Sequence, residues 1–256
     1  MVGEDGGGRA TQMNEIPALA RFRAFAHLEA AELAALLPLV SEPKQYKMNA
    51  ILQREGDRSS AVFLLLQGWT ASSMTVPDGQ RQLLKVHMPG DLIGLPGLPV
   101  TTAPDTVYAL TDIVACRIKL DELGALFGAQ PRLAALLFLI SQEERLMLMD
   151  RLASIGRLSV AGRLAVMILQ LHARMTRHDP EIRDTLRWPL TQADFADLIG
   201  ATTVHTNRTI MQLRQDGILR WDRNEAEILD RAALRRIAGL PERKTAPNQS
   251  WLPPSA

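Results

Sequence analysis

The sequence predicts an α+β fold: an N-terminal antiparallel β jelly roll, then a long helix, then a C-terminal winged helix-turn-helix. Three observations lead to this prediction. Short apolar runs separated by turn residues fill residues 44–120, which is typical of an antiparallel barrel or jelly roll. A helical pattern of apolar residues spans 130–154. Two shorter helical patterns then meet at Gly200, as in a helix-turn-helix.

Length and composition limit the possible classes. A chain of 256 residues suggests two domains, since domains usually hold roughly 100–200 residues. The net charge of +1 excludes a strongly basic arm or acidic tail, and the single cysteine excludes an internal disulfide framework. No run approaches the roughly 18–20 apolar residues of a membrane span, and the N-terminus lacks the features of a secretory signal. We therefore expect a cytoplasmic chain with no membrane partner.

The first part of the chain is predicted to contain a tail and a domain. Residues 1–15 are Gly-rich and acidic, so we expect a disordered tail. Residues 16–129 are assigned to the first domain, which begins with a helical pattern from Leu19 to Val40. The apolar runs that predict its strands are 61–66, 83–86, 107–110 and 113–118.

Residues 130–157 are predicted to form a dimerisation helix. Its apolar residues are spread too widely for one narrow stripe, so one side could lie on the jelly roll and the other on a twin helix. Leu136, Ile140 and Met147 are the candidates for contact with the twin. The alternative is a helix buried within one chain, because polar residues interrupt any coiled-coil seam.

Residues 158–240 are assigned to the helix-turn-helix domain and 241–256 to a flexible tail. Thr191 can cap a first helix, with Asp194 completing a capping-box-like start. Gly200 provides the backbone freedom for a tight turn, and Thr202 can cap the second helix.

The second helix is predicted to have one inward and one outward face. Its inward residues would be Thr206, Thr209, Ile210 and Leu213. Its outward residues would be Thr203, Val204, Asn207, Arg208 and Met211. Small, amide and guanidinium groups near the start of such a helix suit the major groove of duplex DNA. An ordinary helical hairpin remains the alternative.

A wing is predicted after this helix. Strands at 218–221 and 227–229 would flank a turn at 222–226. Arg220 and Arg223 are then placed to contact the sugar-phosphate backbone. Between residues 158 and 240 there are twelve Arg, no Lys and ten Asp or Glu, so DNA affinity must depend on where the arginines lie.

Several motifs together resemble one family. They are Pro89-Gly90-Asp91-Leu92-Ile93-Gly94, the long helix, Leu190-Thr191-Gln192-Ala193-Asp194-Phe195-Ala196 and Val204-His205-Thr206-Asn207-Arg208-Thr209. They resemble the catabolite-activator/fumarate-nitrate-regulator (CRP/FNR) family of bacterial transcription factors over residues 24–240. The resemblance implies a cyclic-nucleotide-binding-like sensor domain and a homodimer on a palindromic site in double-stranded DNA. It also implies contact with RNA polymerase, and no enzymatic activity.

The resemblance assigns DNA contacts by position. It implies contacts from Thr191, Gln192 and Thr202, with the two threonines at helix N-termini that meet phosphates. Arg208 matches the base-reading arginine, for which guanine is the natural partner. Val204 stands where relatives often have a glutamate, so the base preference should differ. Thr203 and Asn207 can hydrogen-bond base edges. His205 could contact a phosphate or remain solvated.

The sensor positions depart from the family pattern. Cyclic-nucleotide-binding members have Gly-Glu where this chain has Gly94-Leu95, and Arg-Ser where it has Ala103-Pro104. Leucine cannot accept from a ribose hydroxyl, and neither alanine nor proline can neutralise a phosphate. We therefore expect no tight cyclic AMP binding. The loop from Leu92 to Val107 could be a ligand cradle or a rigid lid without ligand.

Other sensor chemistries are also limited by the residues present. Cys116 alone cannot hold an iron-sulfur cluster, so no cofactor is expected, although the five histidines leave haem open. Cys116 is expected to be a packing residue in an apolar strand. The alternative function is a jelly-roll small-molecule-binding protein or a cupin-like metalloenzyme. That reading is disfavoured because His87 is the only histidine of the jelly-roll segment.

Overall fold

The computed structural model describes residues 19–76, 79, 81–247 and 249–254, so the predicted tail 1–15 lies outside the described residues. The chain divides into two compact units. The first comprises residues up to 74, 86–141 and 245–256, and the second comprises 75–85 and 142–244. The long helix α5 (Pro131–Arg157) contributes to both.

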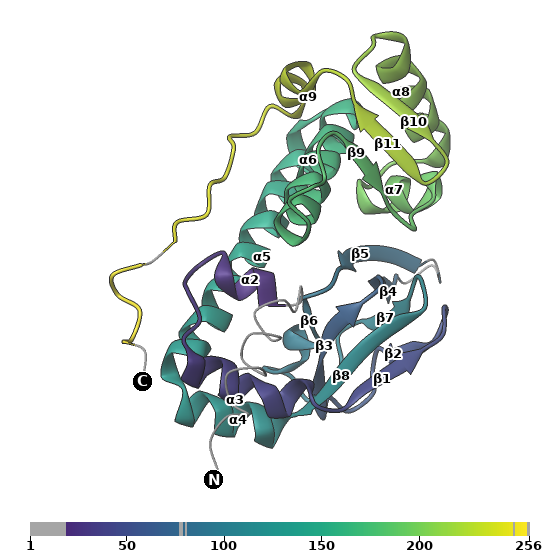
Figure 1. The fold of residues 1–256 in the computed structure, drawn as a ribbon. Helices are drawn as coiled ribbons and strands as arrows, with labels where there is room; N and C mark the ends of the chain where they lie inside the picture. The colour runs from purple at the N-terminus through teal and green to yellow at the C-terminus, as the bar shows by residue number, and fades with distance from the viewer. Residues whose placement is uncertain (1–18, 77–78, 80, 248, 255–256) are drawn as a thin grey trace. The chain divides into compact units, whose positions relative to one another are not determined.

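Two four-stranded sheets form the jelly roll that the sequence predicts (Figure 1). Their strand orders are β1–β8–β3–β6 and β2–β7–β4–β5, and every pairing with a described register is antiparallel. The strands are β1 (Pro43–Tyr46), β2 (Ile51–Gln53), β3 (Ala61–Gln67), β4 (Thr70–Thr75), β5 (Arg81–His87), β6 (Leu92–Ile93), β7 (Thr106–Ala109) and β8 (Ile113–Lys119).

Strand β3 is buried on both faces. Phe63 and Leu65 point into the cluster between the two sheets, where Ile93 and Val107 also lie. Val62 and Leu64 point to the opposite face and pack in the cluster formed with the helices. Because successive side chains of a strand alternate in direction, burial on both faces requires a continuous apolar run. The sequence of β3 shows this run.

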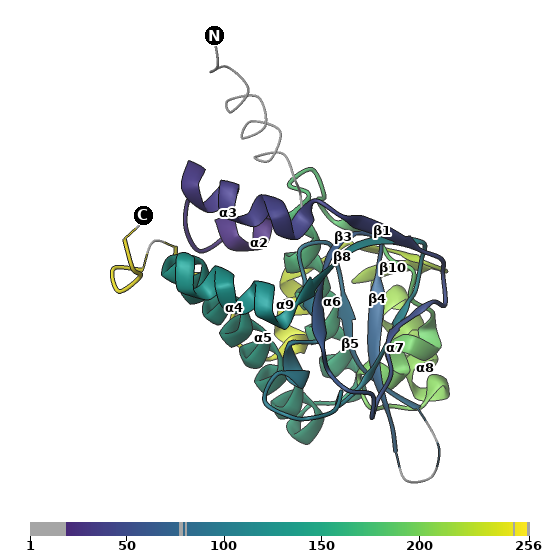
Figure 2. The same ribbon diagram turned by 90° about the horizontal axis from the view of Figure 1, so that it is seen from below.

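The helices of the first unit differ in part from the sequence prediction. The predicted helix 19–40 is two helices, α2 (Ala20–Arg23) and α3 (Ala30–Val40). They are separate because Glu29 adopts an extended conformation and caps α3, where its N–H donates to the Glu32 carboxylate at 2.8 Å. Helix α4 (Leu120–Ala129) was not predicted and follows β8 directly. Helices α3 and α4 pack in the same cluster, beside the sheet that contains β8 (Figures 1 and 2).

The second unit has the winged helix-turn-helix arrangement that the sequence predicts. Its elements are α6 (Val160–His178), β9 (Thr185–Arg187), α7 (Gln192–Leu198), α8 (Thr203–Gln215), β10 (Leu219–Asp222), β11 (Glu225–Ile228) and α9 (Arg231–Ala238). The three strands form one sheet with the order β10–β11–β9. Strand β9 was not predicted, and its pairing with β11 extends the wing to three strands.

Among the described helices, none is long and apolar enough to cross a membrane by itself. Helices α4 and α5, which are bent by 118° relative to each other, meet the criteria of length and composition only as a pair.

Candidate DNA-binding site and sensor domain

Helix α7 begins at the capping box that the sequence predicts. The hydroxyl of Thr191 accepts from the N–H of Asp194 at 3.2 Å, and the Asp194 carboxylate accepts from the N–H of Thr191 at 2.8 Å. Two of the N–H groups that a helix start leaves unpaired are thereby satisfied. Gln192 is the first residue of α7 and is half-buried.

The turn between the two helices is fixed by backbone hydrogen bonds. Gly200 adopts a φ of 63°, which glycine tolerates and other residues rarely do. Its N–H donates to the carbonyl of Asp197 at 3.2 Å, and the N–H of Ala201 donates to the carbonyl of Ala196 at 2.9 Å. These two bonds form a Schellman motif, which ends α7 sharply and directs the chain into α8.

Helix α8 presents the outward face that the sequence predicts. Thr202 caps it by accepting from the N–H of His205 at 3.2 Å. Thr206, Ile210 and Leu213 are buried, whereas Val204 is 69% exposed. Thr203, His205, Arg208 and Met211 are also exposed, and Asn207 is half-buried with an amide oxygen that has no hydrogen-bond partner. A row of exposed side chains, both polar and apolar, therefore lies along one side of α8.

A cluster of three aromatic rings lies between α7 and the wing. Phe195 of α7 lies 4.8 Å from Trp188 and 4.8 Å from Trp221 of β10, measured between ring centroids. Trp188 and Trp221 are 5.1 Å apart. Tilted and edge-on contacts of this kind are favourable beyond the area they bury. They connect α7 rigidly to the wing.

The wing differs from the prediction in its turn. Strands β10 and β11 are joined by Arg223 and Asn224 alone, where five turn residues were expected. Arg223 has a φ of 44°, a left-handed conformation that permits a two-residue hairpin turn. Its side chain is exposed at the tip.

Arg220 lies on β10 and is exposed, as predicted for a phosphate contact. It also forms an ion pair with Glu227, its cross-strand partner on β11. A phosphate would therefore have to compete with Glu227 for this guanidinium.

Two family profiles match this chain one after the other. The profile described as "Cyclic nucleotide-binding domain" matches residues 43–130, and the one described as "Crp-like helix-turn-helix domain" matches residues 162–237. The chain belongs to the CRP/FNR family. These matches indicate a transcription regulator with a helix-turn-helix DNA-binding domain, rather than an enzyme.

Relatives of known role support the assignment to the CRP/FNR family. The transcriptional activator protein FnrA of Stutzerimonas stutzeri is 25% identical over 212 residues, covering 83% of this chain and 86% of that protein. The transcriptional activator protein anr of Pseudomonas aeruginosa is 23% identical, with the same coverage of 83% and 86%.

Solved structures share the fold. FixK2 from Bradyrhizobium japonicum gives a TM-score of 0.70 at 21% identity and covers 78% of this chain and 98% of that one. The regulator CLP from Xanthomonas campestris, described as c-di-GMP responsive, gives a TM-score of 0.63 at 18% identity, with coverage of 79% and 100%.

The positions that the resemblance assigns to a cyclic nucleotide, Gly94-Leu95 and Ala103-Pro104, are engaged in packing. Gly94, with a φ of 92°, precedes the short 3-10 helix η2 (Leu95–Gly97). Leu95 packs against the helical core cluster. Ala103 is buried, its N–H donates to the carbonyl of Asp57 at 2.7 Å, and its carbonyl accepts from the N–H of Gly56 at 2.9 Å. Pro104 is half-buried and lies close to Gly97.

Four polar side chains of the first unit, those of Arg21, Ser72, His87 and Asp91, lie buried and close together. Ser72 and His87 are joined at 2.7 Å between Oγ and Nε2, and Arg21 forms an ion pair of 2.6 Å with Asp91. The Nδ1 atom of His87 lies 3.8 Å from the Asp91 carboxylate. Within the described residues, no group of three His, Cys, Asp or Glu side chains is arranged to hold a metal ion. His87 is thus held by neighbouring side chains inside the jelly roll.

Cys116 lies in β8 and is buried, as expected for a packing residue. Burial raises the pKa of its thiol above the ordinary value, because the thiolate is poorly solvated there.

The predicted dimerisation residues need a correction. Leu136 and Ile140 are 0% and 1% exposed and belong to the helical core cluster of their own chain, so they cannot face a twin helix. Met147 is half-buried and lines a pocket of the second unit. The large apolar side chains that α5 leaves exposed are Phe138, Leu148, Met149, Leu152 and Ile155. The sequence could not distinguish the buried from the exposed face of α5, because apolar residues occur on several sides of this helix.

Proposed function

We propose that this chain is a homodimeric transcription regulator that inserts α8 into the major groove of a palindromic DNA site, once from each protomer. The exposed outward face of α8 is the observation that carries this proposal. It presents Thr203, Val204 and Arg208 on a helix that has a capped N-terminus and a buried inner face. Thr191 and Thr202 would contact phosphates at the helix starts, and Arg208 would reach a guanine edge. Contact with RNA polymerase is part of the same proposal.

The exposed stripe of α5 is the proposed dimer contact. Phe138 and Leu152 are separated by fourteen residues, and Leu148 and Ile155 by seven, which are heptad multiples. All four side chains are exposed in one chain, Leu152 at 73%. Exposed apolar side chains repeated along one helix favour contact with a second copy.

We further propose that the jelly roll does not bind cyclic AMP tightly and, within one chain, holds no iron-sulfur cluster. Leu95 and Ala103 are engaged by the core and by backbone hydrogen bonds, and neither side chain can bind a ribose hydroxyl or a phosphate. This arrangement favours the interpretation of the loop from Leu92 to Val107 as a rigid lid without ligand.

Selection from random DNA duplexes tests the DNA-binding proposal. The full chain should enrich sites with two inverted half-sites whose centres lie about one helical turn, or a multiple of it, apart. Enrichment of single, unrepeated half-sites would contradict the dimer. No enrichment over the input pool would contradict DNA reading by α8. Cyclic AMP added to the same binding reaction should leave the affinity unchanged, and a strong increase would contradict the sensor proposal.

A further inference from the structure

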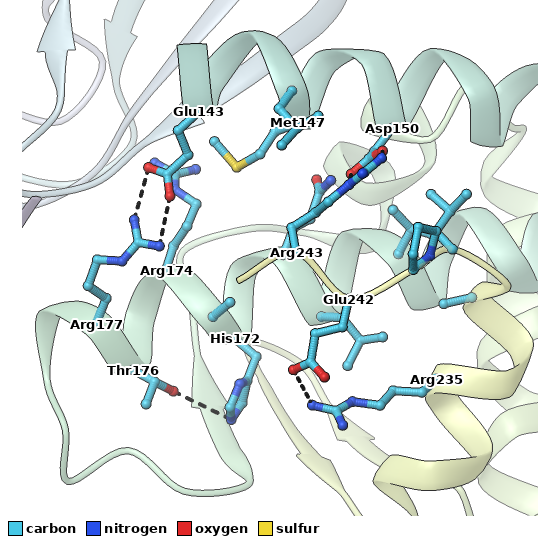
Figure 3. Close-up of a pocket in the computed structure, with 18 of the residues that line it drawn as sticks. Glu143, Met147, Asp150, His172, Arg174, Thr176, Arg177, Arg235, Glu242 and Arg243 are labelled. Atoms are coloured by element: carbon cyan, nitrogen blue, oxygen red, sulfur yellow. Dashed lines mark hydrogen bonds and ion pairs between the residues drawn. The ribbon is translucent and has the colours of Figure 1, made fainter. Parts of the chain in front are cut away.

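A pocket of about 530 Å³ lies within the second unit, between α5, α6, α9 and the segment 240–243 (Figure 3). Its volume is in the range of roughly 300–1,000 Å³ that small-molecule sites usually occupy. Its lining includes no residue of the outward face of α8 or of the loop from Leu92 to Val107. Segment 240–243 follows Gly239, which ends α9.

The pocket combines an apolar wall with many charges. Its apolar lining includes Met147 of α5, Val166 and Ala173 of α6, and Pro241 of the C-terminal segment. Its charged lining consists of Arg174, Arg177, Arg231, Arg235, Arg243, Glu143, Asp150 and Glu242. Five guanidinium groups thus line the pocket with three carboxylates, and a further carboxylate, that of Asp184, forms an ion pair with Arg231 at 2.7 Å. An apolar wall with a few convergent charged groups is the usual make-up of a ligand site.

Two of the ion pairs have two contacts each. One connects α6 to α5, and the other connects the C-terminal segment to α5. Arg177 of α6 binds Glu143 of α5 at 2.8 and 2.9 Å, and Arg243 binds Asp150 of α5 at 2.8 and 3.3 Å. The third pair is different. Arg235 of α9 contacts Glu242 at 2.7 Å, and both side chains are about half exposed. Exposed pairs of this kind are weak, so a bound anion could displace Glu242.

Two arginines of the pocket lie near His172 and affect its pKa. Burial lowers the pKa of His172, and the charges of Arg231 and Arg235 lower it further, against the opposing hydrogen bond to Arg183 and the charge of Asp184. Nε2 of His172 lies 2.6 Å from the carbonyl of Arg183 and 2.7 Å from Nη2 of Arg231.

Arg151 of α5 lies near Arg174 of the pocket. Burial lowers its pKa to about 10, and the nearby charge of Arg174 adds to the effect.

We propose that this pocket is a binding site for a small organic anion with an apolar body. The body lies against Met147 and Ala173, and the anionic group takes the place of the Glu242 carboxylate on Arg235. Arg231 lines the same pocket four residues before Arg235 and is held by an ion pair with Asp184 at 2.7 Å. The planar guanidinium suits a carboxylate, sulfonate or phosphate equally, so this shared chemistry defines the ligand class.

A matched pair of fluorescent probes tests the proposal on the full chain without DNA. The probe 1-anilinonaphthalene-8-sulfonate carries one anionic group, and N-phenyl-1-naphthylamine has the same ring system without it. We expect the wild type to bind the sulfonate at least about 10-fold more tightly than the uncharged probe, since a charge-assisted contact contributes this much. Because no DNA is present, the result does not depend on whether the chain reads a palindrome.

Three variants locate the anion. Arg235→Gln should lose the preference for the sulfonate, and Glu242→Gln should bind it several-fold more tightly, because the competing carboxylate is gone. Arg236→Gln is the matched control, since Arg236 is the next residue of α9, is exposed and does not line the pocket. A tighter Glu242→Gln cannot result from a merely structural role. Equal sulfonate affinity in the wild type, Arg235→Gln and Glu242→Gln, or equal affinity of the wild type for both probes, would overturn the proposal.

Discussion

Cys116 is the only cysteine of the chain, and its side chain in β8 is 1% exposed. Its raised pKa and its burial both suppress the reactive thiolate. We expect the native chain to react with a thiol reagent at the rate at which the jelly roll opens, and quickly in denaturant. Thr203→Cys places a second thiol on the exposed start of α8 and should react at once. Rapid, complete reaction of wild-type Cys116 would contradict its assignment as a packing residue and would favour a redox role.

His172 makes stability depend on pH. Burial, with Arg231 and Arg235, lowers its folded-state pKa below the ordinary 6.5. Between the lowered pKa and 6.5, the unfolded chain binds a proton that the folded chain does not, so stability falls as the pH drops through this window. We expect His172→Gln to flatten the pH dependence of urea unfolding between pH 7.5 and 5.5. His205→Gln, a change at an exposed histidine of α8, should retain it. If the stability of His172→Gln depended on pH as strongly as that of the wild type, His172 would not be the origin of the pH dependence.

At the scale of secondary structure, the capping box of α7 should make a measurable contribution to the free energy of unfolding. Removing the Thr191 hydroxyl leaves the N–H of Asp194 without its partner, which costs about 1 kcal/mol. We expect Thr191→Ala to lower the free energy of unfolding by this amount. Unfolding is monitored by the fluorescence of Trp188 and Trp221 in the adjacent core. Thr203→Ala, an exposed threonine at the start of α8, should change it by less than about 0.5 kcal/mol. Equal losses in the two variants would show that the cap contributes nothing specific.

The helix-turn-helix could be predicted from sequence because its signals are local. Thr191 with Asp194, Gly200 and Thr202 each act on neighbouring backbone groups, and each makes the contact that the sequence implies. Strand β9 could not be predicted in this way, because three residues become a strand only through pairing with β11.

The break between α2 and α3 was missed because apolar residues continue a helical period across it. The exposed face of α5 could not be predicted for a related reason. Leu136 and Leu148 are both apolar, and only the packing of the remaining chain determines that one is buried and the other exposed. The sequence likewise gave no signal for the pocket, because its arginines come from α6, α9 and the C-terminal segment.

At the scale of the whole molecule, the proposed dimer depends on the exposed stripe of α5. We expect light scattering to show a dimer for the wild type at micromolar concentration and a monomer for Leu152→Glu. Leu152 is exposed in the single chain, so a charge there should not affect folding. Leu229→Glu makes the same change at another exposed leucine, after β11, and should remain dimeric. A dimeric Leu152→Glu would move the contact away from this stripe.

The central claim is that α8 reads base edges through Arg208, and a protein–DNA double-substitution series tests it most directly. The affinities of the wild type and of Arg208→Ala are measured by fluorescence anisotropy on the selected palindrome and on duplexes changed at one base pair of each half-site. At the pair that Arg208 contacts, the wild type should discriminate by roughly 1–3 kcal/mol per half-site, and Arg208→Ala should lose that discrimination while keeping it at the other pairs. Unchanged affinity and base preference in Arg208→Ala would contradict the account.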